Sequence, residues 1–189
     1  GWLNTKLKNN HYNLATSKLG TNKFLFRKKM RENKIFSPEF YKISKKKNLQ
    51  KIKYPIICKP LMNSASRGVF VAKNRKEFIK KLEQNDKYYK NFFLAESFFY
   101  GQHFTIDGWF CNNEFHAICL SKNYKSKKYP FTNQKILINY QNPKLLYKAT
   151  ALAKRCCIAI KADKLPIHLE FIKYKNKLVP IDMGIRGAG

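Results

Sequence analysis

Residues 103–111 alternate between apolar and polar side chains, and this pattern restricts the fold of the chain more than any other. Strict alternation is typical of a β-strand whose two faces meet different surroundings. Asn112-Asn113 favours a tight turn, after which residues 114–120 can return as an antiparallel strand. The apolar face would carry Phe104, Ile106 and Phe110, and the polar face His103, Thr105, Asp107 and Trp109. The sequence therefore predicts an antiparallel hairpin with one polar face.

Three helices are predicted beside further strands. One begins at Asn142-Pro143, where apolar residues recur at spacings of four, three and four (Leu145, Ala149, Leu152 and Cys156). A second is expected to start at Thr21 as its N-cap and to end near Asn33. A third, at residues 75–84, follows the capping box of Asn74 and Glu77. Strands are predicted at residues 54–59, 69–72, 93–96, 167–172 and 178–182.

The charge balance is extreme, with 39 basic and 11 acidic residues and a formal net charge of +28. Such an excess is common in nucleic-acid-binding proteins. Here nearly all of it is lysine spread along the whole chain, while arginine, which binds phosphates and bases better, occurs at six positions. We therefore do not expect a nucleic-acid partner. The lysine runs at residues 45–47 and 125–128 are interpreted as solvated loops.

The sequence contains neither an apolar run of about 18 residues nor a secretory leader, so we expect a cytoplasmic protein and no membrane partner. The five cysteines lack the CxxC spacing of a zinc site and are interpreted as reduced core thiols. They are Cys58, Cys111, Cys119, Cys156 and Cys157. Because the chain starts without methionine and stops directly after its richest motif, we expect a fragment.

Two acidic residues are predicted to face each other in the last hairpin. If the turn 175–177 is symmetric about Asn176, Glu170 lies directly opposite Asp182. Carboxylates about 5 Å apart repel unless a proton or a cation lies between them. Mg²⁺ suits such a pair, since it keeps waters and completes its shell with phosphates. The interpretation assumes a ladder without a bulge, which Pro180 makes less secure.

Arg186 has the same parity as Asp182 in an extended backbone and could hold an anion opposite the metal. The alternative is a surface salt bridge to one of the acids.

A phosphate-binding candidate is Lys59, at the end of a strand and followed by a loop of small residues at positions 63–68. The chain has neither a P-loop nor a G-x-G-x-x-G motif, and this lysine and loop could also form an ordinary hairpin.

Together, these segments resemble the ATP-grasp family over about residues 21–189. The matching segments are Thr21-Asn22-Lys23 with Arg27, residues 54–60, residues 64–69, residues 94–98 followed by Gly101, residues 168–170 and residues 181–186. The resemblance implies two α+β lobes with antiparallel sheets that grip ATP between them. Residues 1–20 would be the tail of a preceding region and residues 21–51 a helix and linker. Residues 52–95 would form the small lobe with its phosphate lid, and residues 96–189 the large lobe with the metal site.

The resemblance also implies roles for individual residues. Lys23 and Lys59 would contact the nucleotide and its phosphates, and Ser64, Ser66, Arg67 and Gly68 would close over them as a lid. Glu96, Ser97 and Phe98 would meet the adenine edge through backbone groups, with Glu96 taking the amino group. His103 stands where relatives place a ribose-binding residue, although it could also be an exposed strand histidine.

Glu170 and Asp182 match the two metal-holding acids, and Arg186 together with Lys59 would stabilise the transferring phosphoryl group. Gly184 replaces an asparagine that is often a further metal ligand in relatives. The implied function is an ATP-dependent ligase that uses Mg²⁺, or Mn²⁺, to join a carboxylate to an amine. A homodimer is left open. Three alternatives remain: an ATP-binding module without catalysis, a carboxylase of the biotin-dependent type, and a basic nucleic-acid-binding protein.

Overall fold

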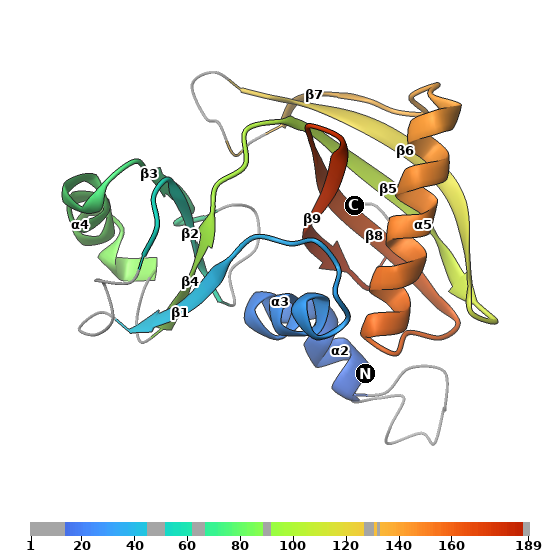
Figure 1. Ribbon diagram of the computed structural model, residues 1–189, viewed down its shortest axis with the longest axis horizontal. Helices are drawn as coiled ribbons and strands as arrows, with labels where there is room; N and C mark the ends of the chain where they lie inside the picture. Colours follow the sequence, from blue (N-terminus) through green and yellow to red (C-terminus); the bar gives the residue numbers. More distant parts are fainter. Residues whose placement is uncertain are drawn as a thin grey trace.

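The computed structural model describes residues 14–44, 52–61, 67–88, 92–126, 131 and 133–186. Two antiparallel sheets form two lobes joined by the chain after β4 (Figure 1). This arrangement confirms the predicted α+β class. Within the described residues, no helix is long and apolar enough to cross a lipid bilayer.

The small lobe contains a four-stranded sheet of order β1-β4-β2-β3. Its strands are β1 (Phe40–Ser44), β2 (Ile56–Pro60), β3 (Phe70–Ala72) and β4 (Phe92–Ser97). Helix α4 (Arg75–Gln84) lies beside it and buries Phe78 against Phe70 and Phe93, and a short 3₁₀ helix, η2 (Asp86–Tyr88), follows. As predicted, Asn74 caps α4, accepting from the Glu77 amide at 2.9 Å. Strand β1 comes from the segment expected to be a linker and pairs with β4.

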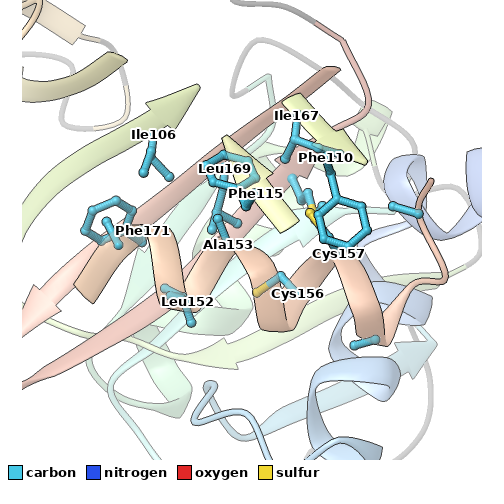
Figure 2. Close-up of a cluster of buried hydrophobic side chains, with 14 of the residues drawn as sticks. Ile106, Phe110, Phe115, Leu152, Ala153, Cys156, Cys157, Ile167, Leu169 and Phe171 are labelled. Carbon is cyan, nitrogen blue, oxygen red and sulfur yellow. The ribbon is translucent and has the colours of Figure 1, made fainter. Parts of the chain in front are cut away.

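The large lobe contains a five-stranded sheet of order β7-β6-β5-β8-β9. Its strands are β5 (Gln102–Cys111), β6 (Glu114–Lys125), β7 (Asn133–Leu137), β8 (Leu165–Tyr174) and β9 (Lys177–Gly184). Helix α5 (Pro143–Ala159) covers one face, and Figure 2 shows its buried residues, among them Leu152, Ala153 and Cys156, packed against side chains of that face. The helix and the β5–β6 hairpin are where the sequence predicts them.

Two helices precede the sheets, and both belong to the large-lobe side of the molecule (Figure 1). Phe26 and Met30 of α3 (Lys23–Glu32) lie in the large-lobe core, and Leu19 of α2 (Leu14–Thr21) packs against it. The predicted N-cap Thr21 is wrong. It ends α2, and Asn22 caps α3 by accepting from the amides of Phe24 and Leu25 at 3.1 Å each.

All five cysteines are free. Cys58, Cys156 and Cys157 are buried as predicted, whereas Cys111 and Cys119 are half-buried on strands of the large sheet. Burial raises the pKa of the Cys156 thiol to about 12. These buried thiols are core residues that stay protonated at neutral pH.

Candidate functional site

The face of the large sheet turned away from α5 is polar, and its residues align in rows across the strands. One row runs Ser121, Thr105, Glu170, Asp182, because these residues are ladder partners from β6 to β9. The next row contains Cys119, Asp107, His168 and Gly184. Directly opposite residues share a face of the sheet. The two predicted metal-holding acids are therefore neighbours in a polar surface.

The β8–β9 hairpin brings Glu170 and Asp182 together by a different route from the predicted one. The turn contains two residues, since Tyr174 pairs with Lys177, and four regular pairs follow it up to Phe171 with Pro180. The register then shifts by one residue, which leaves Ile181 as a β-bulge and makes Asp182 the partner of Glu170. The expectation of a symmetric three-residue turn without a bulge was wrong. The bulge compensates for the shorter turn, so the acid pair was still correct.

A buried cluster of charges lies where the two lobes meet. Arg27 of α3 and Lys59 of β2 form ion pairs with opposite oxygens of Glu96 on β4, the second at 2.7 Å. The side chains of Arg27 and Glu96 are each 1% exposed. Burial alone would raise the pKa of Glu96, but the two cations outweigh it and lower that pKa to about 2. Glu96 is therefore an anion held between two cations.

Glu96 was expected to accept a hydrogen bond from the amino group of adenine. In the structure both of its carboxylate oxygens already accept from the side chains of Arg27 and Lys59. The predicted hinge amides are engaged as well. Ser97 donates its amide to the carbonyl of Glu39 at 2.9 Å, and Phe98 donates to that of Pro55 at 3.0 Å. In the described part of the chain, Phe99 is the first hinge residue whose amide has no protein acceptor. The sequence carried no signal for Phe99, since its availability depends on these two tertiary bonds.

His103 and Lys125 face the small-lobe cation Lys59. Burial lowers the pKa of His103 to about 4, and the charges of Lys125 and Lys59 contribute. Burial also lowers the pKa of Lys125, although the negative charge of Glu170 acts in the opposite direction. The neutral imidazole can both donate and accept a hydrogen bond, as a sugar hydroxyl requires. Lys125 was expected in a solvated loop, but it ends β6 and is half-buried, because β6 extends beyond the predicted strand.

A second pair on the polar face, formed by a histidine and an aspartate, was not anticipated. His168 Nδ1 lies 2.7 Å from Asp107 Oδ1, and its Nε2 lies 4.0 Å from Glu170 Oε1. The hydrogen bond to Asp107 raises the pKa of His168. Half of this pair could be found from the sequence, because the alternation of residues 103–111 placed Asp107 on the polar face. Its partner strand could not be identified without the sheet order.

The surroundings of the two acids fit a divalent cation that also binds phosphates. Asp182 Oδ2 lies 3.8 Å from Lys23 Nζ, and Glu170 faces Lys125 and His168. Among the described residues no three acidic, histidine or cysteine side chains are grouped closely enough to hold a metal by themselves. Mg²⁺ needs only one or two carboxylates when phosphates and waters complete its shell. On the same face, the buried Asn123 Oδ1 has no partner within the described structure, which marks a polar space beside His103.

The remaining predicted residues lie around this surface. A Cβ added to Gly184 would lie 3.3 Å from Cγ of Arg186, so the glycine lets that arginine fold over β9. Ser64 and Ser66 lie outside the described residues. Arg67 is exposed, and Gly68 has a φ of 74° with Tyr88 packed beside it. The structure thus brings Lys23, Lys59, His103, Glu170 and Asp182 to one region.

Comparisons with known proteins support the same fold. A family described as the ATP-grasp domain matches residues 52–189. No curated protein matches the sequence. The solved structure of an L-amino acid ligase from Bacillus licheniformis is 20% identical, with a TM-score of 0.83 over 97% of this chain and 44% of that one.

Two further solved structures differ in their named activities. A D-alanine–D-alanine ligase from Bacillus anthracis, complexed with ATP, is 14% identical, with a TM-score of 0.73 over 92% of this chain and 57% of that one. A phosphoribosylglycinamide synthetase from Anaerococcus prevotii is 13% identical, with a TM-score of 0.69 over 97% and 47%. The chain therefore spans about half the length of these structures. At such identities the likeness is one of fold.

Proposed function

Because this chain belongs to the ATP-grasp family, we propose that it binds ATP and uses it to activate a carboxylate for attack by an amine. The observation that carries the proposal is the pairing of Glu170 with Asp182 on a polar face that also gathers Lys23, Lys59 and Lys125. Cations around a pair of acids suit a polyphosphate that carries a divalent metal.

The reaction would proceed in two steps, phosphoryl transfer and then amide formation. A carboxylate oxygen attacks the γ-phosphorus of ATP, and the bond to the β-phosphate oxygen breaks to give an acyl phosphate and ADP. An amine then attacks the acyl carbon, phosphate leaves, and the nitrogen loses a proton to give an amide. Lys59 and Lys23 would neutralise phosphate charge, and Arg186 would hold the transferring phosphoryl group. His103 would contact the ribose, and the amide of Phe99 would meet the adenine edge.

Glu170 and Asp182 would hold Mg²⁺ or Mn²⁺, which supplies charge neutralisation between the phosphates when bound. The lid residues Ser64, Ser66, Arg67 and Gly68 would cover the phosphates. The acid and the amine are proposed as classes only. The names of the structures that share the fold, two ligases and a synthetase, motivate that choice.

Calorimetric titration with ATP in the presence and absence of Mg²⁺ tests the proposal. We expect Glu170→Gln and Asp182→Asn each to weaken Mg²⁺-dependent ATP binding by about 10- to 100-fold. Glu114→Gln is the matched control, because Glu114 is an exposed acid at the start of β6, where it pairs with Lys154. Equal ATP affinity in all four proteins, with or without Mg²⁺, would contradict the metal site.

A second candidate is a nucleotide-binding module without catalysis, which Gly184 favours because it removes a ligand position common in the family. ADP release from ATP in the presence of mixed amino acids distinguishes the two. Formation of a hydroxamate when hydroxylamine traps the acyl phosphate would support the ligase. ATP binding without either product would support the module.

A further inference from the structure

Among the described residues, Arg27 is the bulkiest fully buried side chain, and its guanidinium bonds two strands, one in each lobe. Its Nε bonds Glu96 on β4. Its Nη1 donates to the carbonyl of Pro180 and its Nη2 to that of Ile181, both at 2.7 Å. Glu96 in turn holds Lys59 at 2.7 Å. One residue therefore connects the small lobe to the strand that carries Asp182.

The two carbonyls that accept from Arg27 belong to the bulge in β9. Successive carbonyls of a regular strand point in opposite directions, so one guanidinium reaches both only where the strand is distorted. Ile181 is the extra residue of that distortion. Without it, the register of the turn would pair Glu170 with Ile181, and Asp182 would point to the opposite face.

We propose that Arg27 is a positioning residue for the candidate ATP site: its guanidinium holds the Ile181 bulge that puts Asp182 beside Glu170, and through Glu96 it holds Lys59. The inference rests on the proposed function, since it concerns the placement of that site's metal and phosphate groups. Arg27 itself is buried beneath the site and acts through its neighbours.

The neighbouring helix geometry agrees with this role. Lys23 precedes Arg27 by four residues, so both side chains lie on one face of α3. Lys23 reaches Asp182 at 3.8 Å, while Arg27 reaches the two residues before it. Only a planar guanidinium has enough donors in a fixed fork to serve a carboxylate and two carbonyls together. Lysine at position 27 would retain the charge but serve fewer acceptors.

The test compares Arg27→Lys with the parent chain in two titrations, Mn²⁺ alone and ATP without metal. We expect the Mn²⁺ dissociation constant to rise about 10- to 100-fold, because the bulge loses its donors. ATP affinity without metal should change less than about threefold, because the ammonium still pairs with Glu96 and Lys59 keeps its position. Arg155→Lys is the control. Arg155 donates to the carbonyl of Lys34 at 3.1 Å but lies on the surface of α5.

Mn²⁺ affinity within about twofold of the parent in a folded Arg27→Lys protein would overturn the inference, as would an equal loss of Mn²⁺ and ATP binding. If Arg27→Lys does not fold, Glu96→Gln decides. Its amide oxygen still accepts from Arg27, so Mn²⁺ affinity should persist, while ATP affinity without metal falls about tenfold because Lys59 loses the carboxylate oxygen that holds it in position. A fall in both would again overturn the inference. A parent chain that binds neither ligand would instead refute the proposed function.

Discussion

The hairpins β5–β6 and β8–β9 are built alike but are stabilised differently. Each turns through two residues, forms four regular pairs, and then has one bulge residue on its second strand, Ile118 or Ile181. Ile118 is 75% exposed, and beside it Gly108 allows β6 to approach closely. The Ile181 carbonyl is instead held by Arg27, 154 positions earlier in the chain. The same backbone distortion is thus supported locally in one hairpin and by a distant buried charge in the other.

The largest expected effect is a loss of stability in acid, and it comes from Glu96, the counter-charge of the arginine that supports the second hairpin. The pKa of Glu96 falls from 4.5 to about 2 on folding, so the folded protein binds this proton less tightly. Its contribution to stability is complete above about pH 4.5 and is lost as the pH falls toward 2. At 1.36 kcal/mol per pKa unit, the loss is about 3 kcal/mol. Urea unfolding at several values between about pH 5 and 2.5 measures this loss in the free energy of unfolding, because Glu96 titrates over roughly that range.

The Glu96→Gln protein is the control for acid unfolding, because it lacks this titration and should lose correspondingly less stability over the same range. Amide exchange sharpens the comparison. In the Arg27→Lys protein, exchange should accelerate around Ile181 before it does around Ile118, because the bulge carbonyls lose their donors. Simultaneous acceleration at both bulges would show that Arg27 does not support the second one specifically.

A smaller effect is expected from Gly108→Ala, which tests local support of the first bulge. The added Cβ would meet the His116 carbonyl oxygen and would lie 2.5 Å from Cζ of Phe115. Overpacking of this kind costs about 1–3 kcal/mol. We expect this loss in the free energy of unfolding, with Mg²⁺-dependent ATP affinity unchanged. A change of ATP affinity without loss of stability would mean that the first bulge also shapes the polar face.

The smallest effect is expected from Ile118→Ser, at the exposed bulge residue itself. Exposed positions away from caps, cores and strained backbone usually change stability by less than about 0.5 kcal/mol. Thermal unfolding of this variant should therefore match the parent closely. A larger loss would show that Ile118 is covered by a part of the chain outside the described residues.

Much of the fold could be predicted because its signals are short-range. Helix α5 follows from Asn142-Pro143 and the four apolar positions after it, which become the buried stripe of the helix. The β5–β6 hairpin follows from alternation and from Asn112-Asn113, whose φ angles are both positive as a tight turn requires. The cap of α3 was misplaced by one residue, from Asn22 to Thr21, since both residue types cap helices.

The candidate site was predicted less directly. The acids Glu170 and Asp182 were paired correctly, but only because a missed bulge cancelled a misjudged turn. Lys125 was placed in a loop because lysine runs are usually solvated. Asp107 and His168 could not be joined, since their contact depends on β5 and β8 being neighbours across 61 residues of sequence.

The sequence by itself determined the periodic elements, their turns and most of their caps, because these depend on residues within about four positions of one another. It also determined the membership in the ATP-grasp family through residues 52–189. Only the tertiary structure decided the register of β9 and the face on which Asp182 lies. A bulge interrupts the regular pairing of the strands and needs other contacts to stabilise it. Here these contacts come from Arg27, which lies 153 and 154 positions before the two carbonyls that it bonds.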